Sequence, residues 1–187
     1  KALSATGKIL AAEEHEDHIF IHGDATAAYQ SLSPEITRAE RESYFVRNSY
    51  FGIVDKVDAD EPVTVQWLLH ANAPYELGKS SFRNTQERAG FYGQVVSSEG
   101  GKPDITQKTE FTDVDPADYE GLPVSTCLTA NYPAAKRHRI ATLLVPYKLD
   151  APKRVFNFMD DQGYDADLYF TDPDENTFKV VMKKLAN

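Results

Sequence analysis

The stretch RESYFVRNSYFGIVDKVDADEPVTVQWLLHAN, residues 41–72, indicates the fold class of this chain. Its apolar runs are rich in Tyr, Phe, Val and Ile, and clusters of Asn, Asp and Pro bound them, a pattern typical of β-strands. A tight turn and a polar break divide the stretch into three consecutive antiparallel strands, which we expect at Tyr44–Val46, Tyr50–Val54 and Val63–His70.

The third of these runs has apolar side chains on both faces. Trp67 lies on one face and Leu68 on the other. A strand of this kind is more typical of the middle of a covered sheet than of an exposed edge. We therefore expect it to be a central strand, buried on both sides.

The remainder of the chain continues in the same style. On both sides of residues 41–72 the pattern continues, so that the chain has about ten short strands separated by turn residues. Only Ala25–Leu32 favours a short irregular segment or a single helical turn. Neither an internal repeat nor a Gly/Ser linker divides the sequence. The pattern predicts one all-β domain over residues 1–187, built as an antiparallel two-sheet β-sandwich.

Composition and charge narrow the classes of function. The formal net charge of −9 argues against a nucleic-acid-binding protein, and any polyanionic ligand would have to rely on a local basic cluster. No run approaches the roughly 18 apolar residues of a membrane helix, so no membrane partner is expected. The chain starts at Lys1, which we interpret as a mature or excised fragment of a longer polypeptide.

Two groups of residues are candidates for metal or thiol chemistry. On a strand, His18 and His22 share a face but lie about 13 Å apart, at roughly 3.3 Å per residue, too far to bind one ion together. The single Cys127 lies in a strand-like run and is expected to pack as a small apolar group rather than act as a nucleophile. We therefore predict no metal site and no cofactor in this chain.

The segment Lys136–Arg139 is the densest basic cluster and precedes an apolar run. It is consistent with a charged flank that protects a hydrophobic strand from aggregation. We favour this interpretation, and the alternative is a site for carboxylate or sulfate groups, which arginine can bind with two parallel hydrogen bonds. No nucleophile elbow, phosphate-binding loop or dinucleotide-binding motif is present.

Several segments occur together in an order that matches a known family. They are Gly23–Tyr29 (GDATAAY), Arg41 ahead of paired strands, Ile53–Val57 (IVDKV), Trp67–His70 (WLLH) and the basic segment Arg137–Pro146 (RHRIATLLVP). In this order and spacing they resemble the C-terminal β-domain of heparinase II/III-like polysaccharide lyases. The resemblance covers roughly Ile9–Pro146.

The resemblance implies an enzyme in which a helical toroid precedes a β-sandwich and cleaves uronic-acid-containing glycans by β-elimination. It places a tyrosine base in the toroid, and the histidine motif and metal ligands in a part of the sandwich ahead of the matched segment. His22-Gly23-Asp24-Ala25 resembles that histidine motif only superficially. We therefore expect no catalytic residue here, and any metal ion would belong to the full-length enzyme.

Five residues at strand ends or in the family-like segments are the candidate substrate-binding residues: His70, Asn72, Tyr29, Arg137 and Arg139. The expected partners are an anionic polysaccharide or oligosaccharide and the upstream toroid domain, in the periplasm or outside the cell. Two alternatives stay open. An independent carbohydrate-binding module should show a platform of exposed aromatic rings, and a purely structural domain should show a large apolar docking patch instead.

Overall fold

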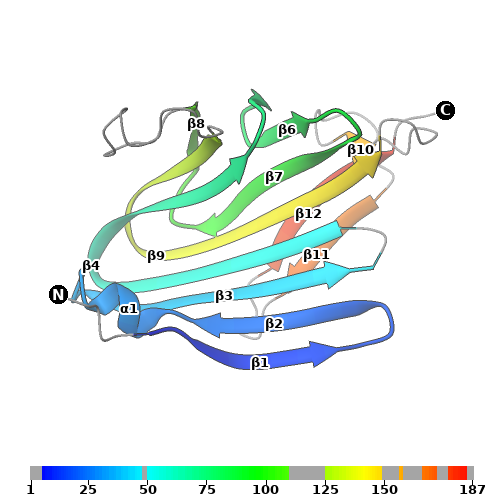
Figure 1. The fold of residues 1–187 in the computed structure, drawn as a ribbon. Coiled ribbons are helices and arrows are strands. Elements are labelled where there is room, and N and C mark those ends of the chain that lie inside the picture. The colour runs from blue at the N-terminus through cyan, green and yellow to red at the C-terminus, as the bar shows by residue number, and fades with distance from the viewer. Residues whose placement is uncertain are drawn as a thin grey trace.

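The computed structural model describes residues 6–47, 50–109, 125–148, 156–157, 166–171 and 177–184. Over these residues the chain is almost entirely β-structure, with one short helix (Figure 1). The elements are β1 (Lys8–Glu14), β2 (His18–Asp24), α1 (Thr26–Gln30), β3 (Ile36–Val46), β4 (Tyr50–Ala71), β5 (Tyr75–Leu77), β6 (Ser81–Thr85), β7 (Ala89–Glu99), β8 (Asp104–Lys108), β9 (Thr126–Lys148), β10 (Phe156–Asn157), β11 (Ala166–Thr171) and β12 (Thr177–Lys184).

The strands form an antiparallel sheet of nine and a smaller sheet of three. In the larger sheet the order is β1-β2-β3-β4-β9-β7-β6-β5, and β8 pairs with β9 beside this path. The smaller sheet has the order β10-β12-β11, and β12 lies next to β7. The predicted all-β antiparallel fold is confirmed.

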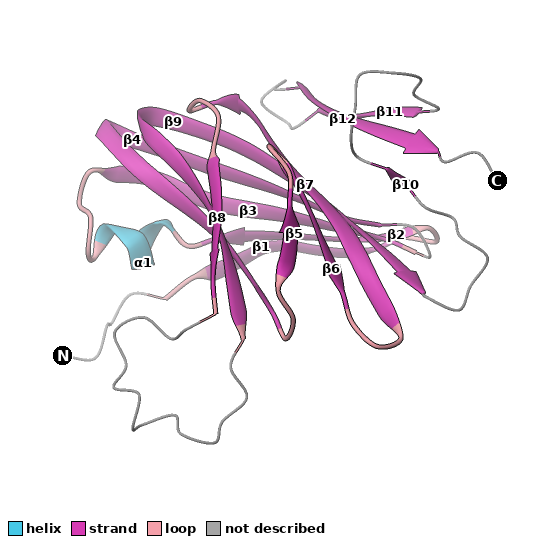
Figure 2. Ribbon diagram, turned by 90° about the horizontal axis from the view of Figure 1, so that it is seen from above, coloured by secondary structure: helices cyan, strands magenta, loops and turns pink. Residues whose placement is uncertain are grey.

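Two strands of unusual length, β4 and β9, organise the larger sheet. They pair along most of their length, but the register shifts between Asp58 and Val65 of β4. Pro62 in β4 and Pro133 in β9 fall in this region, and proline has no N–H to donate to the ladder. Both strands bend at this end of the sheet, close to α1 (Figures 1 and 2).

The bends fold the large sheet over itself. The first half of β4 pairs with β3 and with the end of β9, whereas the second half pairs with the beginning of β9, which also carries β8. Two layers therefore arise within one hydrogen-bonded sheet. This differs from a sandwich of two separate sheets, because the strands that connect the layers bend instead of breaking.

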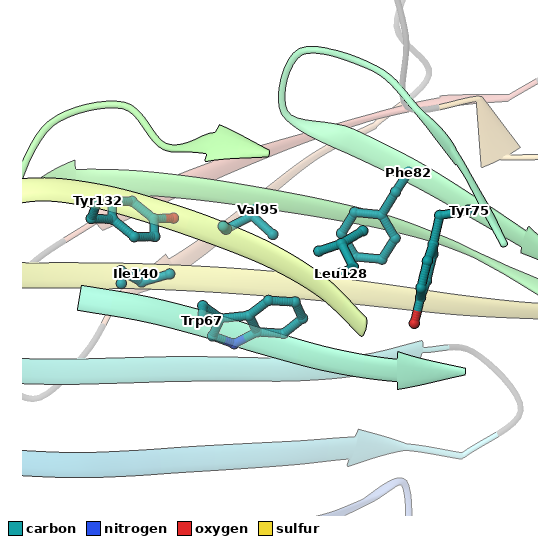
Figure 3. Packing of buried hydrophobic residues seen from close by; sticks show 8 residues of the cluster. Trp67, Tyr75, Phe82, Val95, Leu128, Tyr132 and Ile140 are labelled. Carbon is teal, nitrogen blue, oxygen red and sulfur yellow. The ribbon is translucent and has the colours of Figure 1, made fainter. Parts of the chain in front are cut away.

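The main hydrophobic core lies between these two layers. Trp67, Leu128 and Tyr132 come from the folded-over strands, and they pack against Val95 of β7 and Ile140 near the end of β9 (Figure 3). Aromatic rings of Tyr75 and Phe82 close one side, in an edge-on contact 5.8 Å between ring centroids. Burial of this many large side chains is the dominant stabilising contribution that joins the layers.

For residues 41–72 the predicted β-structure is confirmed, but the details of the prediction are not. The polar segment 58–62, expected as a break, lies inside the continuous strand β4 as its bend. Leu68, expected to be buried, is 49% exposed, whereas Trp67 is 3% exposed. The expectation of a strand covered on both sides is therefore wrong, since the second half of β4 lies in the folded-over layer and has only one covered face.

The other face of the large sheet buries charges. Lys56 Nζ lies 2.9 Å from Glu42 Oε1, and both side chains are almost completely buried. Arg139 is also buried and donates to Asp58, to the Val57 carbonyl and to the His138 carbonyl. Such groups are stable in an interior only when they are paired and hydrogen-bonded.

Candidate functional site

A groove of about 920 Å³ lies where the folded-over layer leaves the first three strands uncovered. Its lining comes from β1, β2, β3, α1, both halves of β4 and the adjoining loops, together with Ala134 and Ile140 of β9. Small residues on β2 and β3, including Gly23 and Ala39, keep it open. The volume is in the range of small-molecule and cofactor sites.

The groove contains a paired arginine and aspartate from neighbouring strands. Arg41 of β3 and Asp55 of β4 are direct partners in the strand register. Arg41 Nε lies 2.6 Å from Asp55 Oδ1, and Nη2 lies 3.1 Å from Oδ2, which makes a two-point contact. The Arg41 side chain is half exposed, so the guanidinium is fixed in orientation but still reaches solvent.

The Asp55 carboxyl lies in a poorly solvated position. Burial raises its pKa above the ordinary value of 3.8, and the hydrogen bonds and charge of Arg41 oppose the rise without cancelling it. The Trp67 indole N–H faces the same carboxylate and also opposes the rise, although it makes no hydrogen bond of good geometry. The groove therefore contains a buried indole N–H that faces Asp55 without forming a hydrogen bond of good geometry.

Tyr29 also lines the groove. It belongs to α1 and is 57% exposed. Its phenol is close enough to interact electrostatically with Arg41, and this interaction adds to the Asp55 contact in raising the pKa of Arg41 against the effect of burial. An exposed ring with a hydroxyl tip beside a fixed guanidinium can contact both the face and the polar groups of a ligand.

Most other carboxylates of the groove already have partners. Asp24 accepts a hydrogen bond from the Thr26 backbone N–H, which lowers the pKa of Asp24. Glu40 contacts Arg38 and His22 at 2.8 and 3.1 Å. Glu40 is thus paired with a cationic side chain, whereas Asp24 stays a hydrogen-bonded, negatively charged group.

The candidate residues from the sequence fall in separate places. Tyr29 lines the groove. His70 and Asn72 are exposed at the far end of β4, where His70 Nδ1 lies 3.5 Å from Ser125 Oγ. Arg137 and Arg139 of β9 come together at Asp58, with nitrogen atoms 3.6 and 2.7 Å from its Oδ1. Arg137 is exposed and also lies 3.4 Å from Glu99, whereas Arg139 is buried. The structure thus does not assemble the five residues into one site, and their contact with substrate stays a prediction.

Metal and thiol chemistry find little support in the part of the chain that the structure describes. The rings of His15 and His18 stack at 4.4 Å, but each histidine is engaged with a neighbouring carboxylate. Within the described ranges, no group of three or more His, Cys, Asp or Glu side chains could hold a metal ion. Cys127 is half-buried in β9, and its Sγ contacts the Leu128 carbonyl.

Sequence reasoning missed the groove as a site. Arg41 and Asp55 both belong to the segments that carry the family resemblance, but they are 14 residues apart and meet only through the β3–β4 register. An arginine and an aspartate at mirror-related positions on two strands of a hairpin are the one signal that could have indicated the pair. Trp67 was assigned to the core, and its contact with the groove depends on the bend of β4.

Comparison with solved structures identifies the architecture. A heparinase III gene product matches 96% of this chain with a TM-score of 0.62 and 16% identity. The chain has a heparinase III-like fold. The heparan sulfate lyase HepC from Pedobacter heparinus matches 97% of the chain at a TM-score of 0.59 and 14% identity, and another heparinase III structure matches 96% at 0.61 and 12%.

This chain covers 28%, 28% and 27% of the length of these three proteins, respectively. No protein-family model matches the sequence, and comparison with curated protein sequences gives no match. Among the described residues, none of the helices is long and apolar enough to span a membrane.

Proposed function

We propose that this chain is the C-terminal β-domain of a heparinase III-like polysaccharide lyase, where it supports a separate catalytic part and contacts an anionic glycan. The observation that carries the proposal is the fold likeness, which extends over 96% of the chain while covering 28% of the matched protein. In an enzyme of that length, the remaining residues would form the helical toroid and would carry the general base, the general acid and any metal ion. The proposed setting is the periplasm or the cell exterior.

The arrangement of polar residues supports a contacting rather than a catalytic role. Arg41 is held by Asp55, Tyr29 is exposed beside it, and Arg137 is exposed on β9. Hydrogen-bond donors in fixed positions can bind and orient a uronate, but β-elimination also needs a general base close to the sugar C5 proton. The proposal assigns these catalytic steps to the separate catalytic part of the enzyme.

The independent carbohydrate-binding module is less consistent with the structure. Such a module needs exposed flat rings, and the single tryptophan of the chain is 3% exposed in the core. Tyr29 by itself does not make a platform. A docked domain that shares a glycan-binding surface with its partner fits the groove and the fold likeness better.

The test compares the complete polypeptide that carries this chain with the chain by itself. With heparan sulfate, the complete protein is expected to form the unsaturated uronate product of β-elimination, measured by its ultraviolet absorbance, and the chain alone is expected to form none. Failure of the complete protein to cleave heparan sulfate or any related uronate-containing glycan would overturn the proposal.

A variant tests the contact made by Arg137. In the complete protein, Arg137→Gln should raise KM for the anionic glycan and leave kcat nearly unchanged, since a binding contact of this kind is lost equally from ground and transition state. Arg83→Gln is the matched control, because Arg83 is also exposed and ion-paired but lies on β6. An unchanged KM in Arg137→Gln would remove Arg137 from the glycan-contacting surface without affecting the lyase assignment.

A further inference from the structure

We propose that the groove is a carboxylate-reading subsite in which Arg41, fixed by Asp55, binds the carboxylate of one uronate residue while Tyr29 packs against the sugar. The inference rests on the proposed contact with an anionic glycan and adds where that contact is made and which ligand group it reads. It rests on residues of α1, β3 and β4 and not on Arg137 or Arg139, so it can fail while the proposed function stands.

The first argument comes from the arginine. Two of its nitrogens, Nε and Nη2, are occupied by Asp55, and Nη1 forms no hydrogen bond among the described residues. The side chain is half exposed although its partner carboxylate is mostly buried. A guanidinium held on one edge by an aspartate presents its remaining N–H groups in a fixed direction, which suits a carboxylate.

The second argument comes from the inner end of the groove. Trp67 is 3% exposed, its Nε1 has no hydrogen-bond partner of good geometry, and the residue lines the groove. Its indole N–H faces the Asp55 carboxylate that also holds Arg41, so a ligand bound at Arg41 would change the surroundings of the indole.

The third argument comes from the edge of β4. From Pro62 onward the second half of this strand pairs with β9 alone, so its other edge is open where it lines the groove. Thr64 and Gln66 are exposed on the face opposite Trp67, and Gln66 Nε2 donates to Asn131 Oδ1, so this edge offers the ligand mainly backbone groups. A wall of backbone donors and acceptors is what a hydroxyl-rich ligand requires.

The charge balance limits the ligand to one with widely spaced negative groups. Lys8 and Arg41 are the cationic side chains of the lining, and Asp24, Glu35, Glu40 and Asp55 are the acidic ones. Asp55 and Glu40 are paired with the guanidinium groups of Arg41 and Arg38, whereas Asp24 and Glu35 make no ion pair among the described residues. The ligand can therefore place one carboxylate at Arg41 but no second one close to Asp24 or Glu35. A uronate flanked by neutral hydroxyl groups meets this condition.

The experiment uses the fluorescence of Trp67, the single tryptophan of the 187-residue chain. An unsulfated uronate-containing tetrasaccharide is titrated into the chain, and the same sugar with its carboxylates reduced to alcohols serves as the neutral ligand. The acid sugar should change the Trp67 emission in a saturable way, and the reduced sugar should bind about ten- to a hundredfold more weakly, the loss expected for charge-assisted hydrogen bonds.

Variants then locate the contact. Arg41→Gln and the double variant Arg41→Gln/Asp55→Asn should both bind the acid sugar as weakly as wild type binds the reduced one; the double variant excludes an effect of the uncovered Asp55 charge. Tyr29→Ala, an exposed position, should weaken both sugars about two- to tenfold. Arg47→Gln is the control, because Arg47 is an exposed residue that pairs with Glu14 away from the groove, and its affinity should equal that of wild type.

Two results would overturn the subsite. One is equal binding of the acid and reduced sugars, or of wild type and a folded Arg41 variant, as checked by circular dichroism. The other is an emission change that appears on association with the rest of the protein but with neither sugar, which would make the groove a domain interface. The proposed function fails separately, through the absence of unsaturated product from the complete protein.

Discussion

Replacing Glu42 with glutamine tests whether the buried ion pair on the outer face of the large sheet holds β3 and β4 together. Glu42 Oε1 and Lys56 Nζ are 2.9 Å apart, and the two side chains are 2% and 1% exposed. Glu42→Gln leaves the Lys56 ammonium buried without this carboxylate. Loss of one partner of a buried pair costs about 3–5 kcal/mol, against about 0–1 kcal/mol for an exposed pair.

The assay is equilibrium unfolding of the chain in urea, extended to a double-mutant cycle. Lys56→Met should destabilise the chain by a similar amount, because it leaves the buried Glu42 carboxylate without the Lys56 ammonium group. Glu42→Gln combined with Lys56→Met should recover most of the loss, since a neutral amide and a thioether no longer require a charged partner. Arg47→Gln, which breaks the exposed pair with Glu14, is the control and should change stability by less than about 1 kcal/mol.

The reasoning is refuted if Glu42→Gln costs no more than the exposed control. It is also refuted if the double variant loses the sum of the two single losses, because the two side chains would then act independently. In either case the burial of Glu42 and Lys56 would not reflect a direct mutual dependence.

Three further predictions concern a turn, a carboxyl group and the basic cluster. Gly100 has φ +96°, and a Cβ at this position would lie 2.3 Å from His138 Nδ1. Gly100→Ala should therefore lower the free energy of unfolding, measured in urea titrations, by at least about 1–2 kcal/mol. An unchanged free energy of unfolding would contradict the close contact. The pKa of Asp55 is raised in the folded chain. Between pH 3.8 and this raised pKa the folded state therefore keeps a proton that the unfolded state has lost. The free energy of unfolding should fall as the pH rises through this window. Asp55→Asn should flatten that part of the profile, and a profile identical to wild type would rule out this origin. Arg139→Gln should cost about 3–5 kcal/mol by removing a buried, paired guanidinium, whereas Arg137→Gln at its exposed site should cost less than about 1 kcal/mol; equal losses would contradict the difference in burial.

Local pattern was sufficient for much of the fold. Alternation in His18–His22 and the aromatic and β-branched runs of Tyr50–Val54 predicted strands that the structure confirms. The short helix at Thr26–Gln30 falls inside the segment where one helical turn was expected. These features can be predicted from the sequence because the side-chain period of a strand and the residues of a turn are determined over a few neighbouring positions. Alternation over residues 109–114 (TEFTDV) predicts a further strand, and this segment lies almost wholly outside the described residues.

The sequence by itself therefore determined the class of the fold, the approximate strands and, through ordered segments, the likeness to heparinase lyases. Tertiary structure decided that Asp58–Pro62 is a bend rather than a break, that Arg139 is buried while Arg137 is exposed, and that Arg41, Asp55, Trp67 and Tyr29 surround one groove. The physical reason is that strand periodicity fixes which face a side chain occupies but not which face is covered. Coverage depends on where β4 and β9 fold over, and that follows from contacts between residues far apart in the chain.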